Sequence, residues 1–190
     1  MNANVRSPLA TPDAETAPTV IQHLQTANSQ ILIHTDGACI GNPGPGGWAF
    51  SFQRTVAGEV IDDQCQSGGE TQKTTNNRME LQAAIEALRA IPPNETAPIT
   101  IHSDSQLLIK GMTEWIANWI KNGWKNASRK PVANRDQWEQ ILDLSKGLNI
   151  TWKWVKGHAG DAQNERVDGL AEGEARAAAQ AAVVARFKAE

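Results

Sequence analysis

Short apolar, β-branched or alternating runs between residues 30 and 67 predict strands. Residues 30–36 read Gln-Ile-Leu-Ile-His-Thr-Asp and lead into a Gly/Pro cluster, which predicts a strand that ends at Asp36. Residues 48–52 alternate as a half-buried strand does, and residues 59–67 predict a third strand. The glycines in the two short loops between these segments favour an antiparallel meander.

Helical periodicity follows the third strand. Apolar residues recur at i, i+3, i+4 and i+7 from Leu81 to Leu88 and predict a helix over 77–90. Glu80 lies at the edge of that apolar face, close to the helix start. Taken alone, Glu80 fits a capping-box partner of Asn77, three residues earlier.

The second half of the chain alternates strands and helices. Residues 99–104 predict a fourth strand, and because a helix precedes it, this strand should run parallel to the first. Its Ile-Thr-Ile-His-Ser-Asp repeats the pattern of the first strand. The remaining predictions are helices over 105–120 and 134–144, a strand over 149–155, and a helix that Asp161 caps and that carries Asp168.

Both ends of the chain differ from its middle. Residues 1–29 are rich in Ala, Thr, Pro, Asn and Gln and predict a disordered tail, with a short helix over 20–26 as an alternative. Residues 176–190 are Ala-rich and predict either a helical extension of the last helix or a frayed tail. The folded domain is therefore expected over residues 30–175.

The composition fits a soluble globular protein, with 40% apolar and 21% charged residues. No apolar run approaches the roughly 20 residues of a membrane span, and the N-terminus lacks the pattern of a secretory signal. The two cysteines, Cys39 and Cys65, do not make a disulfide framework, and we interpret both as reduced thiols. We therefore expect a cytoplasmic protein that does not bind membranes.

The charge is unevenly distributed. A net charge of −3 argues against a protein that coats nucleic acid over its whole surface. Between Asp104 and Asp136, however, six bases face one acid, which gives +5 there and leaves −8 on the rest of the chain. Trp115, Trp119 and Trp124 fall in this basic segment, a combination that suits a nucleic-acid backbone.

Four carboxylates stand out by position: Asp36 and Asp104 at predicted strand ends, Glu80 and Asp168 on predicted helices. A single acid is usually solvated or caps a helix, but four at one sheet edge would repel one another unless cations bind. Oxygen ligands suit Mg²⁺ or Mn²⁺, and the lack of Cys/His clustering in the sequence argues against zinc. Two such ions, about 3.5–4 Å apart, are the usual apparatus for phosphodiester cleavage.

From Ile31 to about Ala171 the chain resembles ribonuclease H of the bacterial type 1 family. The matching stretches are Thr-Asp-Gly-Ala-Cys-x-Gly-Asn-Pro-Gly-Pro-Gly-Gly-Trp at 35–48, Thr-Thr-Asn-Asn-Arg-Met-Glu-Leu at 74–81, Ser-Asp-Ser-Gln at 103–106, Gly-Trp-Lys at 123–125, Lys-Pro-Val at 130–132, and Val-Lys-Gly-His-Ala-Gly with Asn-Glu-Arg-Val-Asp at 155–168. They are long, occur in the family's order and cover nearly the whole domain.

The resemblance implies an α/β fold of the ribonuclease H type. Its five-stranded mixed sheet has the order 3-2-1-4-5, with strands 1–3 antiparallel, strands 4 and 5 parallel to strand 1, and helices on both faces. The resemblance also implies an endonuclease that cuts the RNA strand of an RNA–DNA hybrid with two Mg²⁺ ions, leaving 5′-phosphate and 3′-hydroxyl ends. Mn²⁺ is expected as a substitute.

Roles for the acids follow from the same resemblance. Asp36 is implied to bridge the two ions, and Asp168 to complete the ion beside the attacking water. Glu80 and Asp104 are implied to hold the ion beside the leaving 3′ oxygen. His158, in a glycine-flanked loop, resembles the family's proton shuttle and product-release residue, and an imidazole can exchange protons near neutrality.

Substrate contacts are implied in the same way. Three residues match positions that reach into the minor groove of the hybrid: Asn42, Asn76 and Gln106. Two others match a pocket for a DNA phosphate: Thr75 and Asn77. Short polar side chains suit recognition of 2′-hydroxyl groups. Cys39 also matches a substrate-contacting position, although a small buried thiol explains it equally well.

The basic segment matches a handle-like protrusion of the family. Some of its tryptophans should stack near deoxyribose, whereas Trp119 or Trp138 can belong to the core, and the sequence does not sort them. The expected contacts are Trp115, Lys121, Trp124, Lys125 and Lys130.

The main alternative is a non-catalytic module that binds RNA–DNA hybrids on the same fold. That alternative predicts a lost acid, and all four are present. A plain α/β domain with scattered acids would show no divalent-ion binding. One departure from the family is Gly169 beside Asp168, at a helix position where a glycine costs about 1 kcal/mol. We expect a monomer without an obligate protein partner.

Overall fold

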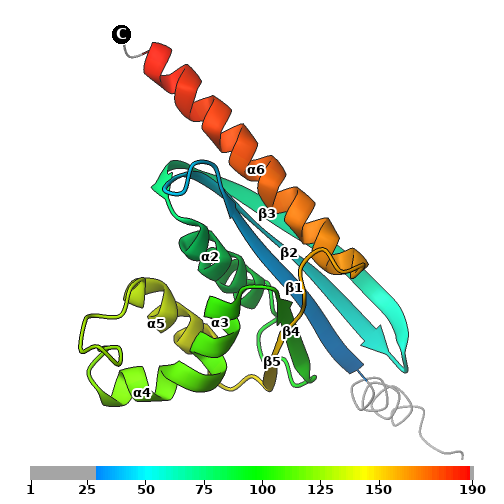
Figure 1. Ribbon diagram of the computed structural model, residues 1–190. Coiled ribbons are helices and arrows are strands. Elements are labelled where there is room, and N and C mark those ends of the chain that lie inside the picture. The colour runs from blue at the N-terminus through cyan, green and yellow to red at the C-terminus, as the bar shows by residue number, and fades with distance from the viewer. Residues whose placement is uncertain (1–28, 189–190) are drawn as a thin grey trace, which may run out of the picture.

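The computed structural model describes residues 29–188. Five strands form one mixed sheet in the order β3-β2-β1-β4-β5. β1 (Ser29–Cys39), β2 (Gly44–Val56) and β3 (Glu59–Thr74) are antiparallel neighbours, while β4 (Ile99–Ser103) and β5 (Ile150–Trp154) run parallel to β1 (Figure 1). The expected fold class and strand order are confirmed.

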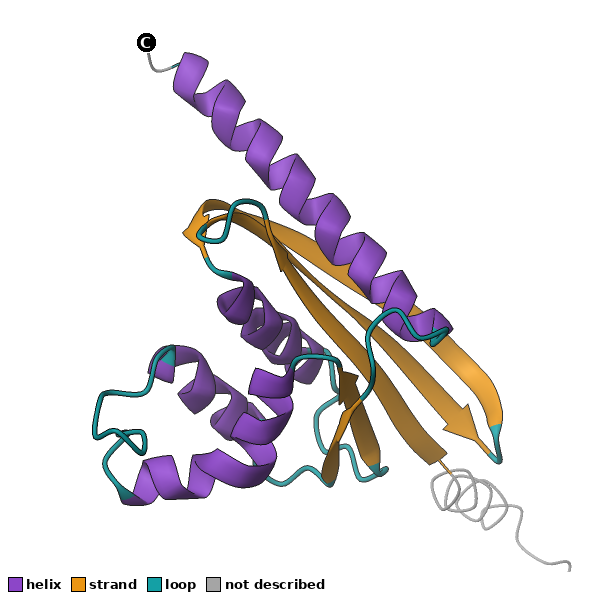
Figure 2. Cartoon of the chain, in the orientation of Figure 1, coloured by secondary structure: helices purple, strands orange, loops and turns teal. Residues whose placement is uncertain are grey.

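Helices cover both faces of this sheet (Figure 2). On one face lie α2 (Asn76–Arg89), α5 (Arg135–Leu144) and a bent stretch built from α3 (Gln106–Lys110), the π-helical segment η1 (Gly111–Trp115) and α4 (Ile116–Lys121). The other face is covered by α6 (Ala162–Phe187), which packs on β1, β2 and β3 and then projects beyond the sheet (Figure 1). Within residues 29–188, α6 is therefore the helix that covers this face of the sheet.

The main core lies between the sheet and the face that carries α2 and α5. Ile31 and Ile33 of β1 belong to one buried cluster with Leu81 and Ile85 of α2 and Trp138 of α5. Each of these side chains is less than 2% exposed. Burying several such side chains is worth roughly 1.5–3 kcal/mol each, so this core fixes α2 against β1.

The contact between α6 and the sheet is unusually close. Ala49 of β2 packs with Val167 and Ala171 in a second, smaller buried cluster. A Cβ added to Gly47 would lie 2.3 Å from the Ala171 carbonyl oxygen, so the helix backbone reaches the strand where the strand has no side chain. Small residues on both sides thus set how near α6 comes to β1 and β2.

Two predicted strand ends are wrong. β1 does not end at Asp36 but continues to Cys39, because its Gly37-Ala-Cys stretch pairs with the glycine-rich start of β2. β3 continues beyond residue 67 to Thr74, since Gly68 and Gly69 stay paired with β2 as well. In both places the glycines that signalled loops belong to strands.

Two helix predictions are also corrected. Glu80 is 6% exposed and is one of the buried residues of α2. The capping-box interpretation of Glu80 is wrong, because the helix begins at Asn76 and the Thr75 hydroxyl caps it by accepting from the Arg78 amide across 3.3 Å. The predicted 105–120 helix is interrupted by η1, which starts at Gly111, where a Cβ would meet the Trp138 ring at 2.2 Å.

The Ala-rich stretch is helical as far as Phe187, as the continuous α6 shows. The predicted N-terminal tail and its alternative helix over 20–26 lie outside the described residues, except Ser29, which opens β1. Across residues 29–188, no helix has both the length and the apolar character needed to cross a bilayer.

Candidate active site

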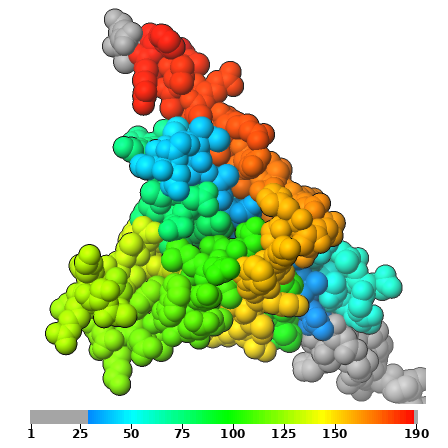
Figure 3. All heavy atoms as spheres, in the orientation of Figure 1, coloured from blue at the N-terminus to red at the C-terminus, as the bar shows by residue number. Residues whose placement is uncertain are grey.

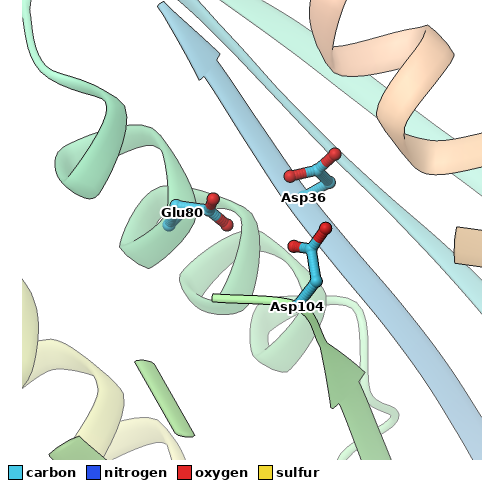
Figure 4. A group of neighbouring side chains, drawn as sticks. All are labelled: Asp36, Glu80 and Asp104. Atoms are coloured by element: carbon cyan, nitrogen blue, oxygen red, sulfur yellow. The ribbon is translucent and has the colours of Figure 1, made fainter. Parts of the chain in front are cut away.

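Three carboxylates meet where β1, β4 and α2 converge. Asp36 comes from β1, Asp104 directly follows β4, and Glu80 projects from the first turns of α2 (Figure 4). One oxygen of each lies within 4.8 Å of the others. The parallel pairing of β1 with β4, in register at His34 and His102, places Asp36 and Asp104 at the same level of the sheet.

The backbone brings Glu80 to this point. A Cβ on Gly37 would lie 2.2 Å from the Glu80 amide nitrogen, so α2 touches β1 at a residue that only a glycine can occupy. The Gly37 amide in turn donates to the Asp36 carboxylate across 2.7 Å. Gly37 therefore lets α2 pack directly against β1, and its amide orients the carboxylate of Asp36.

The electrostatics of this cluster favour a cation. Burial, followed by the charge of Asp104, raises the pKa of Asp36 to about 8. Burial and the charges of Asp36 and Asp104 also raise the pKa of Glu80 well above its usual value, and burial raises the pKa of Asp104. Carboxyl groups with such pKa values repel one another when ionised, and a bound cation removes this repulsion.

The donor set fits a hard divalent ion. Every ligand in the cluster is a carboxylate oxygen, and one of them, Glu80 Oε2, is buried without a hydrogen-bond partner. A buried carboxylate oxygen left unpaired is costly, so an ion at this point would satisfy it. Oxygen-only coordination suits Mg²⁺ and Mn²⁺ rather than Zn²⁺.

Asp168 faces the same place from α6. Asp161 caps this helix by accepting from the amides of Gln163 and Asn164 at 3.1 and 3.2 Å. Asp168 lies two turns on, and its carboxylate lines one pocket of about 320 Å³ together with Asp36, Glu80 and Asp104. The structure thus gathers the four predicted acids around one pocket, with Asp168 outside the tight group of three.

His158 lies beside Asp168 in the loop that precedes α6. Its Nδ1 is 3.7 Å from Asp168 Oδ2, and its side chain is 76% exposed. The backbone there is left-handed at His158 itself (φ +53) and at Gly160 (φ +85), which indicates a sharply turned loop. The imidazole can therefore reach both the solvent and the acid.

The family model described as RNase H matches residues 28–176. The chain belongs to the RNase H family. It is 48% identical over 142 residues to a ribonuclease H of Roseobacter denitrificans, covering 75% of this chain and 93% of that protein. It is 52% identical over 143 residues to a ribonuclease H of Bordetella pertussis, covering 75% and 86%.

A solved structure shows the same similarity in three dimensions. LC9-RNase H1, described as a type 1 RNase H with the type 2 active-site motif, superposes with a TM-score of 0.70 at 32% identity, covering 79% of this chain and 74% of that one. The resemblance to ribonuclease H and the enzyme class expected from it are therefore confirmed.

Within this ribonuclease H fold, the predicted substrate residues divide into two groups. Near the acids, Cys39 and Asn76 line the same pocket, and the Asn42 side chain accepts from the Asn76 amide across 3.1 Å. The Cys39 thiol, half-buried, also contacts the carbonyl oxygens of Gly44 and Thr74, which agrees with either interpretation of this residue.

Gln106 does not line the acid pocket. It borders a separate pocket of about 280 Å³, which Trp154 also lines. In the chain, Gln106 lies two residues after Asp104. Thr75 is occupied as the cap of α2, and Asn77 is exposed in the helix's first turn. These placements keep all three residues within the neighbourhood of the acids without showing contact with a substrate.

The basic segment forms a lobe beside the sheet, coloured green to yellow in Figure 3. Trp115 and Trp124 are half-buried in it, and the Arg135 guanidinium lies 5.2 Å from the Trp124 ring centre. Trp138 is only 1% exposed and is a core residue, with Trp119 packed edge-on against it. The three predicted lysines are exposed: Lys121, Lys125 and Lys130.

Sequence reasoning missed four residues at this site. Glu172 and Arg176 line the acid pocket from α6, and their i+4 and i+8 spacing from Asp168 was a usable signal. Asn164, on the same helix and only 1% exposed, lies beside the Asp104 side chain and partly offsets the rise in the pKa of Asp104. The sequence around Trp154 does not indicate a role at the site, because its contact with Asp104 depends on the pairing of β4 with β5, which are far apart in sequence.

Proposed function

We propose that this chain is an endonuclease that hydrolyses the RNA strand of RNA–DNA hybrids, leaving 5′-phosphate and 3′-hydroxyl ends. The observation that carries the proposal is the cluster of Asp36, Glu80 and Asp104, whose oxygens converge in a chain of the RNase H family. Relatives named ribonuclease H support the reaction. One solved ribonuclease H1 of this fold, at 22% identity and a TM-score of 0.56, is described as a complex with an RNA/DNA hybrid.

Two Mg²⁺ ions are the proposed cofactor, with Mn²⁺ as a substitute. Asp36, Glu80, Asp104 and Asp168 would hold them, since all four line one pocket and offer only oxygen. When bound, the ions supply the positive charge that activates a water and stabilises the leaving oxygen. The chain's own task is to hold these carboxylates close together, although the raised pKa values of Asp36 and Glu80 oppose their ionisation in the ion-free protein.

His158 is the proposed proton carrier. Its Nδ1 lies 3.7 Å from Asp168, so a proton accepted by the imidazole can be stabilised by that carboxylate. Because the side chain is largely exposed, the imidazole can pass the proton to solvent, and it would withdraw as product leaves.

The hybrid is proposed to bind across two regions of one face. Asn42, Asn76 and Gln106 would contact the minor groove near the acids, while Thr75 and Asn77 would hold a DNA phosphate. Cys39 would contact the RNA beside Asp36. The basic lobe would hold the DNA backbone through phosphate contacts and aromatic packing, using Trp115, Lys121, Trp124, Lys125 and Lys130.

The enzyme is proposed to act in the cytoplasm as a monomer, without a membrane or an obligate protein partner. The catalytic domain is proposed over residues 30–175, with residues 1–29 and 176–190 dispensable for the chemistry. A module that binds hybrids without cutting them is the remaining alternative. The intact, converging acids favour the enzyme.

The test is cleavage of an end-labelled RNA–DNA hybrid with Mg²⁺ or Mn²⁺, beside RNA–RNA and DNA–DNA duplexes. Wild type should cut the RNA strand of the hybrid alone, and only with metal. Asp36→Asn, checked for folding by circular dichroism, should bind the hybrid without cutting it. If wild type binds the hybrid and leaves it intact with both metals, the binding module is correct and the proposed reaction is not.

A further inference from the structure

Helix α6 lines the acid pocket with a row of three charged residues. Asp168, Glu172 and Arg176 are each one turn apart, and all three border the pocket of about 320 Å³ that holds the other acids. Arg176 lies eight residues beyond Asp168, which is about 12 Å along the helix axis. The row therefore leads from the cleavage site toward its rim.

The packing of α6 determines where this row points. Gly47 admits the helix so closely that an added Cβ would lie 2.5 Å from the Ala175 amide nitrogen. Gly47 pairs with Ala38, and Gly46 with Cys39, so this contact lies beside the last residues of β1. With Ala171 and Ala175 buried against the sheet, the neighbouring side of the helix faces the pocket.

Most of the charged side chains that line the pocket are negative. Of its eleven lining residues, all within the described chain, five are carboxylates and Arg176 is the one base. Glu172 forms an ion pair with Arg176 at i, i+4 spacing, which directs the guanidinium along the helix. A guanidinium has five donors, so Arg176 can keep this pair and still bind a phosphate.

We propose that Arg176 binds a phosphate of the RNA strand, a short distance along the strand from the phosphate being cut. The inference rests on the proposed function, because it assumes that RNA lies in this pocket. The four acids would hold the ions that bind the scissile phosphate, whereas Arg176 holds the strand where it passes the rim. Arg176 is thus a binding residue and takes no part in the chemistry itself.

The first experiment compares Arg176→Gln with Arg186→Gln, a control that removes an exposed arginine from the last turn of the same helix. Arg176→Gln should raise KM for the hybrid roughly three- to ten-fold and leave kcat within about two-fold. Its log KM should depend less on log salt concentration, by about 0.7–0.9 in slope for one lost phosphate contact. Arg186→Gln should match wild type in all three measurements.

The second experiment replaces single RNA phosphates by neutral methylphosphonates, one position at a time from the cut. For wild type, one position besides the cut should raise KM, and Arg176→Gln should show no added penalty there. Unchanged KM and salt slope in Arg176→Gln, or penalties that add at every position, would overturn the assignment. Failure of the proposed function looks different, because wild type itself would then leave every hybrid uncut.

Discussion

The indole Nε1 of Trp154 donates a hydrogen bond to the main-chain carbonyl oxygen of Asp104, across 3.1 Å. β4 and β5 pair as far as Ser103, whose carbonyl accepts from the Val155 amide across 3.0 Å. Asp104 lies one residue further, where the backbone pairing has ended. The indole therefore extends the strand pairing by one bond and holds the acid in place, although Trp154 itself is 45% exposed.

Trp154→Phe keeps an aromatic ring and removes only this donor. We expect kcat to fall roughly ten-fold, the cost of one hydrogen bond that positions a catalytic group, with KM for the hybrid nearly unchanged. Steady-state kinetics over a range of Mg²⁺ concentrations would measure this, and the variant should need more Mg²⁺. Trp152→Phe, two residues earlier and packed against the main core, is the matched control. A rise in KM at constant kcat would instead make Trp154 a substrate contact.

The raised pKa of Asp36 predicts how stability depends on pH. Its value of about 8 in the folded protein compares with about 3.8 when unfolded, so between these values the folded state holds the extra proton. The contribution of Asp36 to the free energy of unfolding is therefore greatest below pH 3.8 and is lost as pH rises toward 8. Asp36→Asn cannot ionise and should escape this loss.

The measurement is thermal unfolding in EDTA from pH 5 to pH 9. At pH 9, Asp36→Asn should have a higher Tm than wild type, because its free energy of unfolding should be larger by an amount on the order of 2 kcal/mol. This difference should shrink as pH falls. For a domain of this size, each kcal/mol shifts Tm by about 2–4 °C. Glu59→Gln, an exposed acid at the start of β3, is the control and should show no such trend. Equal melting temperatures at pH 9 would contradict the predicted repulsion.

Metal binding should release protons for the same reason. At pH 7 Asp36, whose pKa burial and the charge of Asp104 raise to about 8, holds a proton that a bound ion displaces, and the raised pKa of Glu80 acts in the same direction. The affinity for Mg²⁺ should therefore rise between pH 6 and about pH 8 and then level off. Titration calorimetry at pH 7 in two buffers of different ionisation enthalpy measures the protons released. Identical heats in both buffers would show that these carboxyl groups are already ionised.

Much of the fold was predictable because its signals are local. An apolar, β-branched run marked β1, alternating residues marked β2, the repeat of the first strand's pattern marked β4, and the 3.6-residue period marked α2 before any tertiary contact was known. The convergence of Asp36 and Asp104 followed from two like-patterned strands expected to be parallel. The extent of β1 was not predictable, because Gly37 belongs to a strand only when β2 pairs with it.

Burial and long-range contacts account for the other misses at the site. Glu80 was predicted as a metal ligand, but its burial was not, since nothing in its own helix reveals that Gly37 of β1 lets the chain close over it. The hydrogen bond from Trp154 to Asp104 joins residues 50 apart in sequence. Arg176 carried a signal at i+8 from Asp168, but only the docking of α6 on Gly47 shows which way that side of the helix faces.

Two glycines give opposite predictions for the same change to alanine. At Gly47, the new Cβ would lie 2.3 Å from the Ala171 carbonyl oxygen, so α6 must move away from β2. Gly47→Ala should lose roughly 1–3 kcal/mol of stability, as overpacking does, and should also reduce cleavage because Asp168 moves with the helix. Gly173 meets nothing within 4 Å, and Gly173→Ala should gain up to about 1 kcal/mol from helix propensity. Urea unfolding of both variants measures the difference, and equal effects would contradict the close docking of α6.

The end of α6 gives a prediction about how much of the chain cleavage needs. Ala178 is 5% exposed and packs near Gly69 of β3, whereas Val183 and Phe187 are 50% and 75% exposed. A protein of residues 29–180 keeps every buried contact of the helix and should match the full chain in Tm, kcat and KM. A protein of residues 29–175 loses Ala178 and Arg176, so we expect it to fold with a lower Tm and to cut with a higher KM.

Both shortened proteins should keep kcat within about two-fold of the full chain, because the four acids and His158 are intact in each. Circular dichroism and hybrid-cleavage kinetics, run side by side, separate the possible outcomes. If residues 29–180 show a raised KM, residues 1–28 or 181–190 contribute to hybrid binding. If residues 29–175 fold but do not cut, the end of α6 is required for the chemistry, and the proposed catalytic domain of residues 30–175 is too short.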